Sequence, residues 1–163
     1  MSATQPMLRS LAGTDRSVLE ALLRGVDRFP DTEIAIAMEL IDHGLRGESR
    51  DYLFVVAERE GRVAGYACWG RATMSPGVFD LYWIVVDARL QGGGVGRALL
   101  AHAEREVRRE DGHTLLIETE GSALYEASRR FYLRAGYTEV GRVADFYGPD
   151  KDKVLYAKRL DRT

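Results

Sequence analysis

Apolar residues recur at helical spacing in two stretches near the start of the chain, after a short segment at Met7–Leu8 that can form a strand. Residues three or four apart share one face of a helix, so each stretch predicts an amphipathic helix. The first is capped at Thr14 or Asp15, and the second begins after Pro30 and is expected to stop at Gly44. The predicted buried faces are Val18, Leu19, Leu22, Leu23 and Val26 in the first helix, and Ile34, Ala37, Met38 and Ile41 in the second.

The pattern then changes to strands. Tyr52–Arg59 and Arg62–Gly70 are rich in aromatic and β-branched residues, and Glu60-Gly61 between them predicts a hairpin turn. A third strand is expected at Val78–Val86. Two helices are expected after it, at Val95–Arg109 and Leu124–Ala135. A strand at Thr114–Thr119 lies between them, and strands at Tyr137–Val143 and Lys153–Lys158 follow them. An antiparallel meander followed by a strand-helix-strand unit predicts an α/β domain (an α+β mixed sheet), and we expect residues 1–163 to form this single domain.

The composition excludes several classes of function. With 163 residues, of which 45% are hydrophobic and 29% charged, the chain has the balance of a globular domain. Its net charge of -2 provides no basic field of the kind that nucleic-acid binders use. No stretch approaches the roughly 20 apolar residues of a membrane span, and Met1–Ser10 lacks the apolar run of a signal peptide. We therefore expect a cytoplasmic protein with no nucleic-acid or membrane partner.

Cysteine and histidine usage gives no sign of a metal or a thiol nucleophile. Cys68 is the only cysteine, and its apolar neighbours indicate a small buried hydrophobe. His43, His102 and His113 fall on separate predicted elements without the spacing of metal ligands. We expect no metal.

A glycine-rich loop joins the strand Val78–Val86 to the helix that follows it. Unpaired backbone N–H groups and the helix dipole create an anion site at such a helix start. Four glycines in the five positions from Gly92 to Gly96 cost conformational entropy, so a purely structural loop would rarely use them. Arg97 stands where a Walker loop needs lysine and where a dinucleotide fingerprint needs its third glycine. We predict instead a different pyrophosphate-binding loop.

Two motifs resemble those of the GNAT acetyltransferases. Gln91-Gly-Gly-Gly94-Val-Gly96 is similar to the family element [Q/R]-x-x-G-x-[G/A], and Ser128-Arg-Arg-Phe131-Tyr132-Leu-Arg-Ala135-Gly136-Tyr137 is similar to A-x-x-F-Y-x-x-x-G-[F/Y]. The resemblance covers Tyr52–Leu160. It implies the GNAT fold, a mixed sheet of about six or seven strands flanked by about four helices, with a V-shaped cofactor cleft between two central strands. It also implies acetyl-coenzyme A as cosubstrate. Many relatives carry Asn and Ala where this chain has Tyr125 and Ser128.

By this resemblance, the end of the third predicted strand and the glycine loop bind the cofactor. Main-chain groups of Ile84, Val85 and Val86 would bond the pantetheine arm like an added strand, and the N–H of Val85 would polarise the thioester carbonyl. The pyrophosphate would be held by the backbone of Gln91, Gly92, Gly93, Gly94, Val95, Gly96 and Arg97.

The resemblance also suggests two catalytic residues. Tyr132 matches the tyrosine that donates a proton to the departing thiolate in many relatives, and we favour this role over the alternative of a core aromatic. A protonated amine must lose a proton before attack, which calls for a carboxylate. Glu118 and Glu120 share one face of their strand, so alternation cannot separate them, and either can be a solvated surface charge. We favour Glu118, which lies more firmly inside the strand.

The acceptor side is expected to be acidic and aromatic. Asp80 can pair with a substrate ammonium, and Tyr82, Glu33 and Glu120 complete the predicted substrate-binding set. We therefore expect acetyl transfer to a primary amine of a small cationic metabolite, by direct attack in a ternary complex. The alternatives are a catalytically inactive acyl-coenzyme A sensor and a peptide or protein N-acetyltransferase. Because relatives often pair through their C-terminal strands, a homodimer is also expected.

Overall fold

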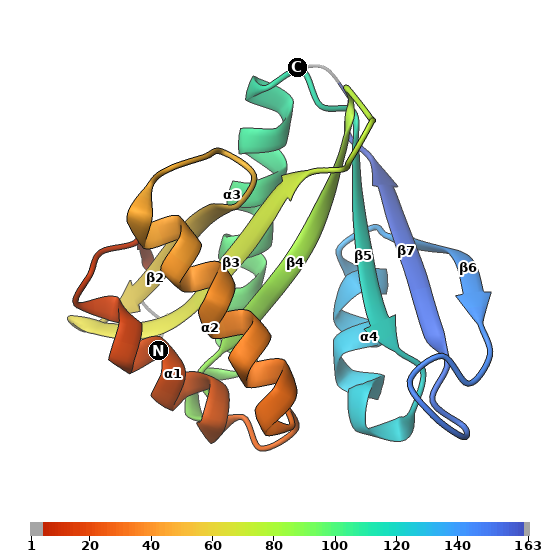
Figure 1. Cartoon of the computed structure of the whole chain (residues 1–163), viewed down its shortest axis with the longest axis horizontal. Coiled ribbons are helices and arrows are strands. Elements are labelled where there is room, and N and C mark those ends of the chain that lie inside the picture. The colour runs from red at the N-terminus through yellow and green to blue at the C-terminus, as the bar shows by residue number, and fades with distance from the viewer. Residues whose placement is uncertain (1–4, 162–163) are drawn as a thin grey trace. The chain divides into compact units, whose positions relative to one another are not determined.

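The computed structural model describes residues 5–161 and shows a mixed sheet with flanking helices (Figure 1). Within these residues the strands are β1 (Met7–Arg9), β2 (Leu53–Arg59), β3 (Arg62–Arg71), β4 (Val78–Val86), β5 (Thr114–Glu120), β6 (Thr138–Val143) and β7 (Lys153–Arg159). The α-helices are α1 (Asp15–Gly25), α2 (Asp31–Arg46), α3 (Val95–Arg109) and α4 (Glu126–Arg134), with 3₁₀ turns at Ala88–Leu90 and Ala123–Tyr125. Residues 1–4, part of the Met1–Ser10 segment considered above, lie outside the described range.

The strand order confirms the predicted α/β class. It is β1-β2-β3-β4-β5-β7-β6, in which β4 and β5 are parallel and the pairs β1–β2, β2–β3, β5–β7 and β7–β6 are antiparallel. The described residues group into two compact units. The first contains the residues up to Gly70 together with Trp83–Arg105, and the second contains Arg71–Tyr82 and the residues from Glu106 onward. The end of β4, the glycine loop and most of α3 therefore belong to the first unit.

The core of the first unit lies between α1, α2 and its strands. The predicted helix residues Leu19, Leu22, Leu23, Ile34, Ala37, Met38 and Ile41 are all buried, together with Val56, Tyr66, Cys68 and Val85 of the strands. Val18, which was also predicted to be buried, is 43% exposed. The buried face of this short helix is therefore narrower than predicted. α3 packs against the strands from the other side (Figure 1). His102 of α3 contacts the ring of Trp69 of β3.

Helix α2 ends later than the sequence suggested. The helix runs through Gly44 to Arg46, and its C-cap is Gly47, whose φ of 64° lies in the left-handed region. Gly44 is needed for a different reason, because a Cβ at this position would lie 2.4 Å from the ring of Phe54. The prediction of a stop at Gly44 was therefore wrong, since close packing and helix termination both select glycine.

The hairpin between β2 and β3 forms as predicted. Glu60 and Gly61 have φ values of 54° and 74°. Two successive residues with positive φ fit the twist of a two-residue hairpin, which confirms the turn read from the sequence.

A close approach of β3 to β4 sets the position of the strand that leads into the glycine loop. A Cβ added at Gly65 would lie 2.5 Å from Val85 O and 3.2 Å from Val86 Cα. We expect Gly65→Ala to destabilise the protein by about 2 kcal/mol, because backbone must move to make room. Urea denaturation measures this, with Gly25→Ala in α1 as control, because a Cβ at Gly25 meets no atom within 4 Å. Equal stability of the two variants would contradict the close approach.

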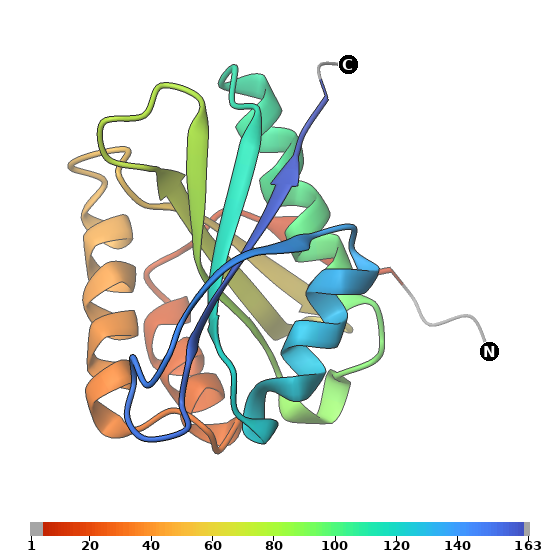
Figure 2. The same ribbon diagram turned by 90° about the vertical axis from the view of Figure 1, so that its right-hand side faces the viewer.

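The second unit is a sheet with α4 on one face (Figure 2). Leu115, Ile117, Val154 and Tyr156 are buried, and the ring of Tyr156 contacts Tyr132 of α4. Directly opposed residues share a face of a sheet, so the register places the remaining side chains of β5 on the other face. This second face carries Asp80 opposite Leu116, Glu118 opposite Leu155, and Glu120 opposite Lys153.

Candidate functional site

The glycine loop Gln91–Arg97 turns the chain from β4 into α3. Asp87 Oδ1 accepts a hydrogen bond of 2.9 Å from Arg89 N, which caps the 3₁₀ turn before the loop. The same arginine holds the pKa of the Asp87 carboxyl below its usual range. Gly92 and Gly94 have φ values of 79° and 84°, which favour glycine. At these two positions the backbone path itself requires the glycines found in the sequence.

The start of α3 leaves backbone N–H groups outside the helical ladder. The first hydrogen bond of the helix runs from Ala98 N to Gly94 O, at 3.0 Å. The N–H groups of Val95, Gly96 and Arg97 therefore have no carbonyl partner within the helix, and the helix dipole adds positive potential at the same end. This arrangement suits a phosphate or pyrophosphate group.

Arg59 braces the glycine loop, and no sequence pattern had singled it out. Its Nη2 donates a hydrogen bond of 2.6 Å to Gly93 O, from the end of β2. Gly93 N donates to Leu90 O at 3.3 Å, so both polar backbone groups of Gly93 hold the loop in place. The Gly93 N–H therefore already has a hydrogen-bond partner within the turn. Arg59 and Gly93 are 34 positions apart in the chain, so no local motif indicates this contact.

The predicted pantetheine-binding residues end β4 directly before the loop. Ile84, Val85 and Val86 are the last three residues of the strand, and the side chain of Val85 is buried in the core of the first unit. The last described pair of the parallel ladder between β4 and β5 is Leu81 with Ile117. Strand backbone that continues past its ladder can offer N–H and C=O groups to an extended ligand.

Three charged residues form a carboxylate cluster on the face of the second unit's sheet that lies opposite Leu115 and Ile117: Asp80, Glu118 and Lys153. Lys153 Nζ lies 2.8 Å from Glu118 Oε2, and their side chains are 18% and 49% exposed. Burial raises the pKa of the half-buried Asp80 above its usual range, the negative charge of Glu118 raises it further, and Lys153 opposes the shift. Within the described residues no lysine, arginine or histidine forms an ion pair with Asp80. The cluster therefore contains one carboxylate in an ion pair and one that, among the described residues, is in none.

The other predicted acceptor residues have different surroundings. Tyr82 follows Asp80 by two positions, shares its face of β4 and is 39% exposed. Glu120 accepts a hydrogen bond from the hydroxyl of Ser122. Glu33 lies in the first turn of α2, in the first unit, and its part in binding an acceptor stays a prediction.

Tyr132 is a buried member of an aromatic cluster. Its side chain is 7% exposed, and its ring centroid lies 6.3 Å from that of Tyr137 and 6.0 Å from that of Tyr156. Such packing fits the core role that the sequence left open, and it also fixes the phenol in one orientation. A fixed phenol is a suitable proton donor, so the two roles are compatible.

A rigid turn between β6 and β7 places an aromatic ring beside the carboxylate cluster. Lys153 Nζ lies 4.4 Å from the centroid of the Phe146 ring, a cation–π distance. Phe146 also meets Tyr147 edge to face, with centroids 4.8 Å apart, and the two side chains are 53% and 44% exposed. Asp145 holds the turn: its N bonds Asp152 Oδ1 at 3.1 Å, and its Oδ1 accepts from Asp150 N at 2.8 Å.

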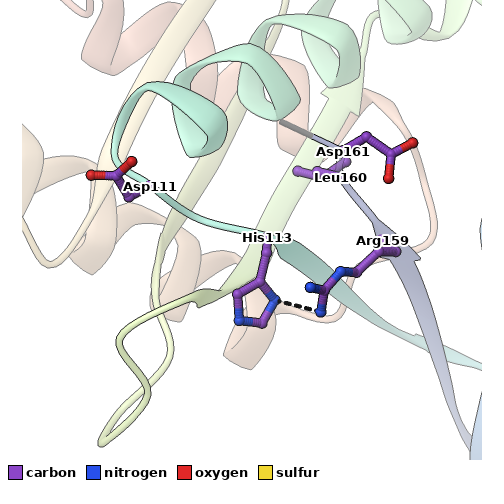
Figure 3. Close-up of a pocket in the computed structure, with 5 residues that line it drawn as sticks. All are labelled: Asp111, His113, Arg159, Leu160 and Asp161. Atoms are coloured by element: carbon purple, nitrogen blue, oxygen red, sulfur yellow. Dashed lines mark hydrogen bonds between the residues drawn. The ribbon is translucent and has the colours of Figure 1, made fainter. Parts of the chain in front are cut away.

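A hollow of about 250 Å³ lies in the second unit, at the opposite end of β5 from Glu118 (Figure 3). It is lined by Asp111, His113, Arg159, Leu160 and Asp161. Arg159 Nη1 lies 3.1 Å from Nδ1 of His113, and Thr114 Oγ1 lies 2.9 Å from the same nitrogen. The histidine is therefore engaged in local contacts, and we assign the hollow no part in catalysis.

Further observations bear on thiol, metal and membrane chemistry. Cys68 is fully buried, and burial raises the pKa of its thiol, which makes it a poor nucleophile. Over residues 5–161, no group of three or more His, Cys, Asp or Glu side chains is arranged to hold a metal ion. None of the helices in that range combines the length and apolar character needed to cross a bilayer.

Comparisons with known proteins agree with these features. The family model described as acetyltransferase (GNAT) domain matches residues 50–139. A protein named IAA acetyltransferase from Azospirillum brasilense is 33% identical over 112 residues, which span 68% of this chain and 69% of the relative. A crystal structure of a GNAT-family acetyltransferase from Desulfovibrio desulfuricans is 35% identical, with a TM-score of 0.91 over 96% of this chain and 99% of that one. An aminoglycoside 6'-N-acetyltransferase in complex with coenzyme A shares the fold, with a TM-score of 0.76 at 18% identity over 96% of this chain and 98% of that one.

Proposed function

Because this chain belongs to the GNAT acetyltransferase family and uses acetyl-coenzyme A, we propose that it acetylates a primary amine by direct attack in a ternary complex. The observation that carries the proposal is the start of α3, where Val95, Gly96 and Arg97 present N–H groups outside the helical ladder. These amides would bind the pyrophosphate of the cosubstrate. Ile84, Val85 and Val86 would bind its pantetheine arm as an added strand.

Asp80 is the best candidate for the general base. The sequence favoured Glu118, but Oε2 of Glu118 is engaged in an ion pair with Lys153 Nζ at 2.8 Å. Asp80 has a pKa above its usual range, because it is half-buried and lies near the charge of Glu118. A carboxylate with a raised pKa accepts a proton more readily, and it can first pair with the incoming ammonium.

The proposed reaction uses three groups of the chain. Asp80 takes a proton from the substrate ammonium, and the neutral nitrogen then attacks the thioester carbon. The Val85 N–H stabilises the oxyanion that forms on the carbonyl oxygen. As the carbon–sulfur bond breaks, Tyr132 donates its phenolic proton to the thiolate. The attacking nitrogen then loses its second proton, which restores the Tyr132 phenol, and Asp80 releases the first proton to solvent. The products are an N-acetylamine, coenzyme A and one proton.

Replacing Tyr132 tests the proton donor. We expect Tyr132→Phe to lower kcat about a hundredfold while the Kd for coenzyme A changes less than about twofold, because only the phenolic hydroxyl is lost. Tyr156→Phe is the matched control, since this tyrosine is 2% exposed in the same aromatic cluster. It should retain turnover within about threefold. Full turnover by Tyr132→Phe across the pH range would show that Tyr132 is only a core residue.

Two measurements test the function as a whole. Coenzyme A should raise the melting temperature more than adenine dinucleotides do, because only a ligand that binds the native state stabilises it. A thiol-release assay with acetyl-coenzyme A and a panel of amines should then detect turnover. Binding without turnover of any amine or peptide would favour the acyl-coenzyme A sensor, and turnover only with peptide N-termini would favour a protein N-acetyltransferase.

The location and assembly of the protein remain predictions. We propose that it acts in the cytoplasm, in keeping with a lone, buried cysteine. We also propose a homodimer, supported by β6 at the end of the strand order, where Val140 and Val143 are 59% and 47% exposed. Size-exclusion chromatography with light scattering measures the oligomeric state.

A further inference from the structure

The carboxylate cluster offers an incoming amine one uncompensated negative charge. The ion pair between Lys153 and Glu118, at 2.8 Å, partly offsets the charge of that glutamate. Asp80 has no ion-pair partner among the described residues. With all three residues ionised, the cluster carries two negative charges and one positive charge, which leaves a single net negative charge for the substrate.

Phe146 supplies an apolar surface next to this charge. The centroid of its ring lies 4.4 Å from Lys153 Nζ. The ring therefore contacts one member of the Lys153–Glu118 ion pair. Phe146 is 53% exposed, although the turn that carries it is held by the two hydrogen bonds of Asp145. An exposed aromatic ring on a braced turn can bind an apolar group with little loss of conformational entropy.

Resting on the proposed amine acetylation, we infer that the acceptor is a small monoamine bearing an aromatic group, and that polyamines are rejected. Asp80 pairs with the single ammonium, and Phe146 packs against the aromatic group. Lys153 discriminates against polyamines, because a second ammonium near Glu118 would meet the positive charge of the lysine. Lys153 thus acts as a specificity residue by neutralising Glu118 and repelling a second cation.

Matched amines separate the two parts of this inference. Butylamine and 1,4-diaminobutane have the same chain length and differ by one ammonium, whereas 2-phenylethylamine adds a ring to a monoamine. We expect kcat/KM to be highest for 2-phenylethylamine and lowest for 1,4-diaminobutane. Lys153→Met should reduce the preference for butylamine over 1,4-diaminobutane about tenfold, since it frees the charge of Glu118. Phe146→Ala should lower kcat/KM for 2-phenylethylamine about tenfold and leave butylamine within about twofold.

Two control variants exclude general effects of mutation. Lys151→Met removes an exposed lysine from the same turn, and Val140→Ala removes an exposed apolar side chain from β6. Neither should change the order of the amines. Melting temperatures of all variants, with and without coenzyme A, confirm folding and cosubstrate binding.

The outcomes distinguish this inference from the proposed function. Higher kcat/KM for 1,4-diaminobutane than for 2-phenylethylamine would overturn the inference and leave amine acetylation standing. The inference would also fail, with amine acetylation intact, if Lys153→Met changed kcat/KM for butylamine and 1,4-diaminobutane equally. Coenzyme A binding without turnover of any amine would instead overturn the proposed function itself, and the inference with it.

Discussion

Asp80→Asn should lower kcat by about a hundredfold to a thousandfold, the range expected when a general base is removed. The substitution keeps the shape of the side chain and removes only its capacity to take a proton. Cosubstrate binding should be unaffected, because the cofactor-binding groups proposed above are backbone atoms of β4 and the glycine loop. Thiol-release kinetics measure kcat, and calorimetry measures the Kd for coenzyme A.

The same variant should be more stable than the wild type at neutral pH. Burial and Glu118 raise the pKa of Asp80 in the folded state. A carboxyl group with a raised folded pKa contributes its full stability below its unfolded pKa of about 3.9, and this contribution is lost as the pH rises through the folded pKa. At neutral pH the ionised Asp80 therefore destabilises the fold, and the neutral Asn removes the effect. The gain in melting temperature should disappear near about pH 3.5.

The pH dependence of turnover follows from the same shift in pKa. In the wild type, kcat should rise with pH as Asp80 loses its proton, with a midpoint above the ordinary range of an aspartate. Glu118 and Lys153 face Asp80 from β5 and β7, and Glu120 lies further along β5. In Asp80→Asn, kcat should no longer show this rise with pH.

Glu118→Gln provides the matched control for the base. It removes a neighbouring carboxylate from the same face and should retain kcat within about fivefold for a monoamine, since Glu118 is already paired with Lys153. A loss of turnover in Glu118→Gln together with normal kcat in Asp80→Asn would contradict the assignment. In that case the base would be Glu118, which the sequence favoured for its position inside the strand.

Sequence patterns located the elements of the fold well because those patterns are local. The spacing of Leu19, Leu22 and Leu23 identified α1, and Glu60-Gly61 identified the hairpin turn. Gly44 was misread because a single letter does not distinguish a helix stop from a close contact, here with Phe54 of β2. The missing information was tertiary: which residue packs against the glycine.

The candidate site shows the same difference between local patterns and tertiary contacts. The glycine loop could be recognised because all of its groups lie within a few residues of one another. From the sequence, Glu118 was favoured over Glu120 as the base, and Asp80 was assigned to the substrate ammonium. The ion pair of Glu118 could not be foreseen, because Lys153 reaches Glu118 only through the register of β7 against β5. Arg59 was missed for the same reason, since its contact with Gly93 joins distant parts of the chain. Local sequence thus identifies a candidate cosubstrate loop more readily than the distant contacts that separate candidate catalytic residues.

Gly94→Glu should weaken coenzyme A binding by more than about a hundredfold, because it places a carboxylate at the anion site. The Gly94 carbonyl accepts the first hydrogen bond of α3, from Ala98 N, so a side chain at this position starts beside the free amides of the helix. A Cβ there meets no atom within 4 Å, which leaves room for the new side chain. The φ of 84° adds backbone strain of about 1 to 2 kcal/mol, too little to unfold most domains.

Gly47→Glu separates binding from strain. Gly47 also has a positive φ, 64°, and open space around its Cβ, but it caps the C-terminus of α2. This variant carries the same charge and comparable strain, so it should lose similar stability and keep wild-type affinity for coenzyme A. Acetylpantetheine, which lacks the pyrophosphate, should bind wild type and Gly94→Glu with equal affinity. If Gly94→Glu bound coenzyme A as tightly as Gly47→Glu does, the amides at the start of α3 would not be the pyrophosphate site, and the proposed acetyl transfer would lose its main support.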